Sequence, residues 1–402
     1  MWRRYGDVTF AAVFAVVISL EVIPLGYLTW TLASRLVGTS DGMRFGTILL
    51  GVVGSTAAAL VLLTTYVLAY QHVSTRHERV REERRRAWVA RWLRVLDGSE
   101  RAPSGTLRPE ALDALLALRE TLRGSDSTRV AALLERYGAV VRLERIASHG
   151  RAGRRLDAIV ALSNARIPAS LPTLVTGVGD PNRTISVASA RAAARTLARV
   201  EDLFDRDRAA ASLARAIDAA ELPYGIVEEV VVLSEDAAIS LIQVLLLQVR
   251  PRAATVRAAI DGVGRLQLLV FAEEVVHFLS HPDDEVRAAA LRAVGRLGFL
   301  PPSSQGIVIA ALGDDLDFIR IHATGAARLL PRPQALAFLS ERLGDRSWWV
   351  RRAAADALVD LGPAGLAQLG RAVREHPDRF ARDIAEQALR DHVPELVQAV
   401  VG

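Results

Sequence analysis

The chain has 402 residues, no cysteine and a formal net charge of +5 at pH 7. The lack of cysteine excludes disulfides, thiol nucleophiles and cysteine-based zinc sites. All 50 basic residues are arginine, and without lysine the chain can carry neither Schiff-base chemistry nor a phosphate-binding loop of the lysine-containing type.

The positive charge is unevenly distributed along the chain. Residues 1–100 contain 12 arginines against 8 acidic residues, whereas residues 101–402 contain 38 against 37. A surface that follows a nucleic-acid backbone needs a basic excess, which the second part does not have. We therefore expect no nucleic-acid partner.

Two long apolar segments open the chain. Residues 8–34 contain one charged side chain, Glu21, and residues 45–70 contain none. A transmembrane helix needs roughly 20 mainly apolar residues, so both segments qualify. Because a second span follows the first, we interpret the first as a retained anchor rather than a cleaved signal. The sequence predicts a transmembrane helical hairpin over residues 1–70.

Arginines predict the orientation of this hairpin. Two precede the first segment, eight lie within residues 71–94, and only two lie in the loop between the segments. Arginine-rich flanks stay on the cytoplasmic side. We therefore expect a protein of the cell (inner) membrane, with both termini and everything after the hairpin in the cytoplasm.

Glu21 lies near the middle of the first apolar segment, three residues before Pro24. An ionisable group at this depth normally faces protein or water. Folding the hairpin places Glu21 level with Ser55 and Thr56, so one interpretation is a protonated side chain hydrogen-bonded inside the hairpin. The alternative is a contact with another membrane protein.

Residues 71–107 form the next predicted region, an arginine-rich juxtamembrane helix and a linker. Trp88 and Trp92 are four residues apart and share a helix face. Arg84, Arg85 and Arg86 are candidates for contact with anionic lipid headgroups. The alternative is a linker helix whose tryptophan face docks on the rest of the protein.

The remaining residues, 108–402, contain an internal repeat. Five arginines recur at intervals of 30, 33, 31 and 31 residues: Arg257, Arg287, Arg320, Arg351 and Arg382. A period of 20–50 residues is typical of solenoids. In the last four repeats an aspartate that can cap a helix precedes the arginine, and small apolar residues follow at helical spacing. A second helical stretch lies upstream, so one repeat is a pair of antiparallel helices.

This pattern resembles the HEAT-repeat family, most clearly over residues 253–390 and more weakly upstream, where Asp180 opens a similar phrase and Arg155 keeps the spacing. The resemblance implies an all-α fold, an α-solenoid of HEAT-like helix pairs following the two-helix hairpin. It also implies a ladder that links successive repeats through their aspartates and arginines. The residues carried over are Asp283, Arg287, Asp314, Arg320, Asp345, Arg351, Asp378 and Arg382. An arginine row that binds an anionic ligand is the alternative.

Other sequence features give weaker signals. Glu273, Glu274, His277 and His281 have helical spacing, but they lie at a repeat turn and match no complete metal motif, so we predict no metal site, cofactor or catalytic residues. Residues 226–279 are apolar enough for a buried middle or an exposed groove. The adjacent Trp348 and Trp349 are candidate interface residues, although one of them is expected to pack between repeats.

We therefore expect a membrane-anchored, non-enzymatic scaffold or adaptor that binds a protein, with no small-molecule substrate. A membrane enzyme, such as a glycosyltransferase of surface-polymer synthesis, would suit this architecture as the partner. One alternative is a sensor of anionic lipid surfaces that works through the arginine-rich helix. The other is an enzyme, because some HEAT-like proteins that resemble this repeat act as lyases or DNA glycosylases.

Overall fold

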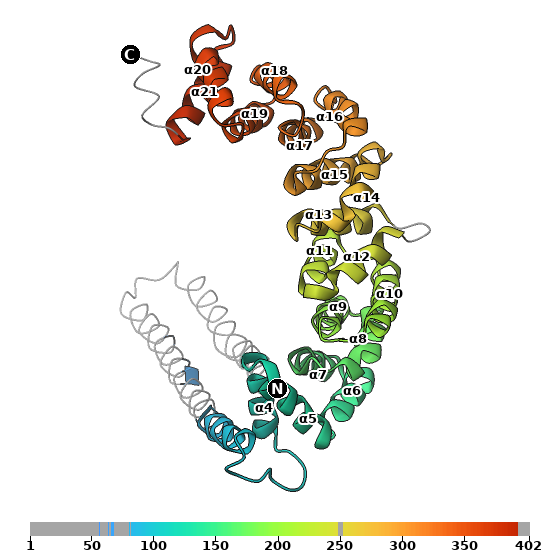
Figure 1. Ribbon diagram of the computed structural model, residues 1–402. Coiled ribbons are helices and arrows are strands. Elements are labelled where there is room, and N and C mark those ends of the chain that lie inside the picture. Colours follow the sequence, from blue (N-terminus) through green and yellow to red (C-terminus); the bar gives the residue numbers. More distant parts are fainter. Residues whose placement is uncertain are drawn as a thin grey trace, which may run out of the picture. The chain divides into compact units, whose positions relative to one another are not determined.

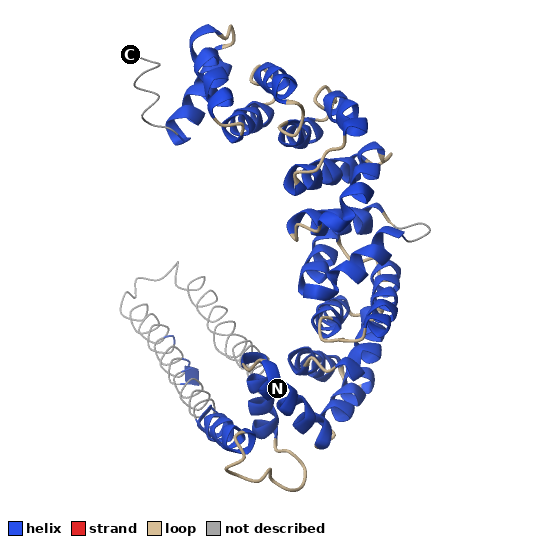
Figure 2. Cartoon of the chain, viewed as in Figure 1, coloured by secondary structure: helices blue, strands red, loops and turns tan. Residues whose placement is uncertain are grey.

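The computed structural model describes residues 82–247 and 252–392, together with Thr56, Leu63, Tyr66, Val67 and Val80. Throughout these residues the regular structure is helical, without strands (Figure 2). Apart from Thr56, Leu63, Tyr66 and Val67, the predicted transmembrane hairpin lies outside the described residues, and so does Glu21. The all-α solenoid that the repeat predicts is present.

The chain divides into two compact units, Met1–Glu100 and Arg101–Gly402. The described part of the first unit is a helix over residues 82–96, followed by a turn. The second unit begins its helices with α4 (Pro109–Thr121) and α5 (Gly124–Arg136).

From residue 139 onward the helices alternate between two layers (Figure 1). The first-helix layer contains the leading helix of each pair. Its members are α6 (Ala139–His149), α8 (Leu171–Val178), α10 (Leu203–Ala219), α12 (Ala238–Leu247), α14 (Ala272–His277), α16 (Gln305–Ala311), α18 (Arg332–Arg342) and α20 (Pro363–Glu375). Short 3-10 turns precede or follow several of these helices, at Pro168–Ser170, Glu235–Ala237, Leu269–Phe271, Phe278–Ser280 and Pro302–Ser304.

The second-helix layer contains the trailing helix of each pair, and each of its members packs on the next along the solenoid. Its members are α7 (Ala152–Ala165), α9 (Arg183–Leu197), α11 (Tyr224–Leu233), α13 (Ala253–Arg265), α15 (Asp284–Leu297), α17 (Asp317–Ala327), α19 (Trp348–Asp360) and α21 (Arg379–His392). This layer forms the continuous core to which each repeat adds one helix.

Helix α15 shows how the sequence produces this packing. The carboxylate of Asp283 accepts hydrogen bonds from the backbone N–H groups of Glu285 and Val286, which fixes the start of the helix. Gly298, with φ of 69°, ends it in the left-handed conformation that glycine adopts without strain. The apolar side chains between these caps are buried, and four of the eight are alanine.

Small residues also set the distance between neighbouring second-layer helices. A Cβ atom added to Gly264 on α13 would lie 2.9 Å from the Cα atom of Ala293 on α15. Real Cβ atoms do not approach a backbone atom this closely. The two helices therefore pack as tightly as they do because position 264 has no side chain.

No single helix in the described residues is long and apolar enough to cross a membrane. One bent pair, Tyr224–Leu233 with Glu235–Leu247, reaches the required length and composition, with an angle of 114° between its two parts. Most apolar side chains of this pair are buried, among them Val227, Val230 and Leu241.

Candidate interaction surfaces

The repeating arginines first organise their own repeats. The last four of them, Arg287, Arg320, Arg351 and Arg382, fold back from their second-layer helices onto carbonyl oxygens of the turn before each helix. Arg287 Nη1 donates to the carbonyl of His281 at 3.2 Å, and Arg320 Nη1 to that of Asp314 at 2.7 Å. Arg382 makes the same contact with the carbonyl of His376 at 2.7 Å. This contact ties the turn to the helix it introduces.

Three of these arginines also reach an aspartate of the following repeat. The three rungs are Arg287–Asp314 at 3.7 Å, Arg320–Asp345 at 2.9 Å and Arg351–Asp378 at 2.9 Å. Upstream, Arg155 pairs with Asp180 in the same sense. The structure thus brings six of the eight predicted ladder residues into pairs between repeats.

The other two predicted ladder residues have different contacts. Asp283 caps α15, and the arginine one repeat earlier, Arg257, pairs instead with Glu285 at 2.8 Å. Arg382 donates only to carbonyl oxygens, and within the described residues it has no carboxylate partner. Arg382 lies at the start of α21, and the described residues contain no later repeat that could supply an aspartate to it.

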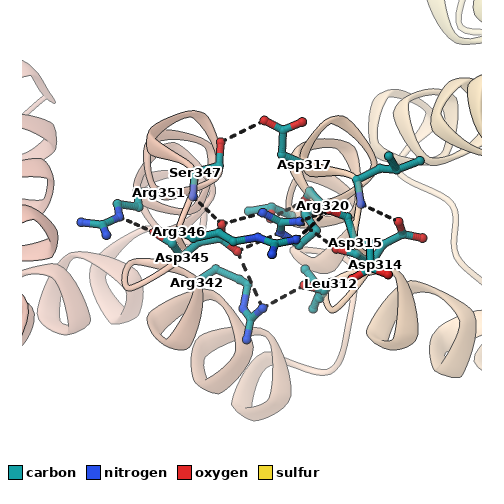
Figure 3. Close-up of polar contacts among 12 residues, drawn as sticks. Leu312, Asp314, Asp315, Asp317, Arg320, Arg342, Asp345, Arg346, Ser347 and Arg351 are labelled. Atoms are coloured by element: carbon teal, nitrogen blue, oxygen red, sulfur yellow. Dashed lines mark hydrogen bonds and ion pairs between the residues drawn. The ribbon is translucent and has the colours of Figure 1, made fainter.

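The central rung is the buried one (Figure 3). The side chains of Arg320 and Asp345 are each 4% exposed, and two parallel hydrogen bonds of 3.0 and 2.9 Å join them. Burial alone would raise the pKa of Asp345, but hydrogen bonds from Arg320 and from the Ser347 N–H, with the charges of Arg320 and Arg342, lower it below its ordinary value. The hydrogen bond to Asp345 raises the pKa of Arg320. Both groups are therefore held in their charged forms.

An aromatic edge lies at the start of the last two second-layer helices. It consists of Trp348 and Trp349 on α19 and Phe380 on α21, which are 49%, 64% and 64% exposed. The two indoles meet edge to face with ring centroids 4.7 Å apart, and the Arg351 guanidinium lies 5.5 Å from the Phe380 ring centroid. The expectation that one tryptophan packs between repeats was wrong, since both are exposed.

Residues 305–390, which hold the aspartates of all three rungs and the whole aromatic edge, match the family model described as HEAT repeats. These residues are HEAT repeats. No curated protein matches the chain. One solved structure similar to it is the crystal structure of an engineered protein, with 16% identity over 72% of this chain and 96% of that one. The TM-score of 0.29 is too low for that likeness to support any functional argument.

A second row of polar contacts begins upstream of the HEAT repeats, on α11, and ends within them, on α17. Sequence reasoning missed this row. Asp261 on α13 is 1% exposed and accepts hydrogen bonds from Tyr224 on α11 at 2.8 Å and from Arg292 on α15 at 2.7 and 2.6 Å. Arg292 Nη1 lies 2.8 Å from Nε2 of His322 on α17. We call these four residues the buried network.

Burial shifts the titration of two members of the buried network. Burial and the hydrogen bond to Asp261 raise the pKa of Tyr224, so the phenol stays protonated and donates. Burial, with the charge of Arg292, lowers the pKa of His322 to about 4. His322 is therefore neutral at physiological pH and accepts from Arg292. Four successive second-layer helices are linked in this way.

The sequence did contain a signal for the buried network. Arg292 follows Asp261 by 31 residues, and His322 follows Arg292 by 30, which is the repeat length. The signal was missed because the residue type changes at each step. An aspartate within the apolar run of α13 was the clearest indication.

The juxtamembrane candidates lie in the helix over residues 82–96. Trp92 is buried and its ring centroid lies 5.7 Å from that of Trp88. Arg85 and Arg86 both bond to Glu82, and Arg84 is exposed. Contact between these arginines and anionic lipid stays a prediction.

The apolar middle is mostly interior. Within residues 226–279 most apolar side chains of α11, α12 and α13 are buried, and Leu247, Leu269 and Val270 are the most exposed, at 69%, 63% and 66%. The His277 ring bonds to the Glu273 carbonyl, and the His281 ring to the Asp283 N–H. Among the described residues no three His, Cys, Asp or Glu side chains gather as a metal site would need.

Proposed function

We propose that this chain is a membrane-anchored scaffold whose HEAT-repeat solenoid binds another protein through the aromatic edge. The exposure of three aromatic rings on one edge of the HEAT repeats carries this proposal. Tryptophan and other aromatic side chains supply much of the binding energy at protein interfaces, and they lose little conformational freedom on binding.

The ladder beneath the aromatic edge supports the same function. Arg351 pairs with Asp378, and Trp349 and Phe380 each lie two residues before an arginine of the repeat series. The rung therefore fixes the distance between the two helices that carry the rings. A partner would meet a preformed surface and would not need to order it, which favours affinity.

The anchor is proposed from the sequence. Two apolar segments within residues 1–70 and the arginines that follow them support a hairpin with the solenoid at the cytoplasmic face of the cell membrane. A partner for such a protein is itself a membrane protein, and Glu21 is the proposed contact within the bilayer. A membrane enzyme such as a glycosyltransferase is the partner class suggested by this architecture alone.

Recovery of the partner from native membranes tests the proposal. The tagged full-length chain, extracted in mild detergent after crosslinking, should retain one membrane protein that mass spectrometry identifies. The double variant W349S/F380S should lose the partner, because it removes two rings of the aromatic edge. The variant should still fold, since both side chains are more than half exposed and their removal leaves the core unchanged.

Phe204 provides the matched control, because it is 74% exposed at the start of α10, far along the chain from the aromatic edge. The variant F204S should retain the partner. Equal recovery by W349S/F380S and the unmodified chain would refute the aromatic edge as the binding surface. Purification of the unmodified chain without any membrane protein would refute the scaffold function itself.

A further inference from the structure

A group of arginines lies in the N-terminal half of the solenoid, at the C-terminal ends of three helices. Arg119 is in the last turn of α4, Arg166 caps α7, and Arg195 is in the last turn of α9 with Arg199 just beyond it. We call these four residues the arginine cluster. Cations are favoured at helix C-termini, where backbone carbonyls lack partners.

Helix ends explain only one member of the cluster. Arg119 donates to the carbonyl of Ala165 at 2.9 Å and to that of Arg166 at 3.5 Å, and so closes the end of α7. Arg166 and Arg199 instead point their charges at one carboxylate, that of Glu235. Arg195 makes no hydrogen bond or ion pair with any residue of 82–247 or 252–392.

Glu235 is a weak counterion for these arginines. Its two carboxylate oxygens lie 3.7 Å from Arg166 Nη1 and 3.5 Å from Arg199 Nη2, beyond the 2.7–2.9 Å usual for charge-assisted bonds. The Glu235 side chain is 49% exposed, and its backbone has φ of 47°, which is unfavourable for a residue with a side chain. Nothing in this arrangement fixes the carboxylate between the arginines.

The members of the cluster lie close enough to repel one another. After burial, the charges of Arg199 and Arg166 lower the pKa of Arg119. After burial, the charge of Arg199 lowers the pKa of Arg166, while Glu235 opposes that change, and Arg195 adds to it. Glu120 opposes it too, but more weakly. Among the described residues, Glu235 is thus the one carboxylate that pairs with any of these four positive charges, and it is loosely held.

We propose that Arg166, Arg195 and Arg199 form a binding site for a phosphate monoester dianion, and that the Glu235 carboxylate occupies part of this site when the ligand is absent. A dianion with three terminal oxygens can accept short hydrogen bonds from three guanidinium groups at once, whereas a carboxylate has only two oxygens. The ligand displaces the Glu235 carboxylate and takes over its role of neutralising the arginine charges. The site lies far along the chain from the aromatic edge and does not depend on the protein partner.

Calorimetric titration of the full-length protein in detergent at low salt tests this site, with inorganic phosphate as the probe. The unmodified chain should bind phosphate, and the variant E235Q should bind it about fivefold more tightly, because a competing negative charge is gone. The variant R195Q/R199Q should bind it at least about tenfold more weakly.

A matched control removes the same charge elsewhere. Arg208 and Arg215 on α10 are exposed, and R208Q/R215Q should leave phosphate affinity unchanged. An equal loss in this control would show a general effect of charge and overturn the site. So would a failure of both the unmodified chain and E235Q to bind, or weaker binding by E235Q. Because E235Q changes affinity upward, the test survives even if R195Q/R199Q fails to fold.

A second probe identifies the source of the phosphate. Short-chain phosphatidic acid carries the same monoester on a lipid. If it binds more tightly than inorganic phosphate and loses this binding in R195Q/R199Q, the site recognises a lipid headgroup. If both probes bind equally, the site recognises a soluble phosphorylated molecule. Both outcomes assign the same arginines to the same chemistry.

Discussion

The solenoid is held together by two polar rows that differ in position and composition. The ladder lies at the starts of the second-layer helices and repeats one pair, arginine with aspartate, as in Arg320–Asp345. The buried network lies within helices α11 to α17 and changes residue type at every step, from Tyr224 through Asp261 and Arg292 to His322. In both rows a carboxylate, that of Asp345 or Asp261, is buried, and several hydrogen-bond donors offset the cost of its burial.

The difference shows what each row can contribute. Every ladder arginine is also bonded to the turn of its own repeat, so a rung is a side contact on an already fixed side chain. The network has no such second anchor at Asp261, which depends on donors from two neighbouring helices. The ladder therefore both reinforces each repeat and links it to the next, whereas the network acts only between repeats.

Loss of the central rung should have the largest effect. The variant R320A leaves the Asp345 carboxylate, 4% exposed, without its main partner, and should lower the free energy of unfolding by about 3–5 kcal/mol. The double variant R320A/D345A should lose less than R320A alone, because no buried charge remains unpaired. Urea denaturation measures both, and a larger loss in the double variant would contradict the argument.

A break in the buried network should cost somewhat less. The variant D261A leaves Tyr224 and Arg292 without their acceptor, but the Arg292 side chain is 21% exposed and water can reach it. We expect a loss of about 2–3 kcal/mol in the free energy of unfolding. The control D360A removes a half-exposed carboxylate that pairs with Arg328, and should cost about 0.5 kcal/mol. Similar losses in the two variants would show that burial does not decide the cost.

The two rows also differ in how far the sequence predicted them. The ladder was predictable because Asp345 and Arg351 keep the same chemistry at the same place in each repeat. The network was not, since period alone does not relate a tyrosine to an aspartate and a histidine. Nor could the arginine cluster be predicted, because its members come from three helix ends that only the packing brings together.

For the two exposed tryptophans the sequence led to a wrong prediction, namely that one of them is buried. Their residue type favoured burial of one of them, but position relative to Arg351 decides exposure. Val350 immediately before the arginine is fully buried, and Trp349 and Trp348, one and two residues earlier, lie outside. Helical register therefore overrides the apolar character of the side chain.

Acid should weaken the network through His322. Its pKa is lowered from 6.5 to about 4, chiefly by burial and then by Arg292, with Asp261 opposing and Arg296 and Arg257 adding to the shift. Between these two pH values only the unfolded chain takes up the proton, so the free energy of unfolding falls as pH falls from 6.5 to 4. Above pH 6.5 both states are neutral and this contribution is complete.

The expected loss is on the order of 2 kcal/mol, given about 1.4 kcal/mol for each pKa unit and some solvent access to the ring. Other groups titrate in the same range, so the measured quantity is the difference between the unmodified chain and H322Q. Glutamine can accept from Arg292 but does not titrate. Parallel stability curves for the two proteins from pH 7 to 4 would contradict a neutral, buried His322.

The smallest effect should come from the longest of the three rungs, Arg287–Asp314. Arg287 and Asp314 are 3.7 Å apart and their side chains are 25% and 24% exposed, so water already screens the pair. The variant D314N removes the charge but keeps an oxygen that accepts the hydrogen bond from the Leu316 N–H, so the helix start is preserved. We expect a loss of about 0.5 kcal/mol in urea denaturation. If D314N cost as much as R320A, the ladder would act as one cooperative unit, and burial of a single rung would not set its contribution.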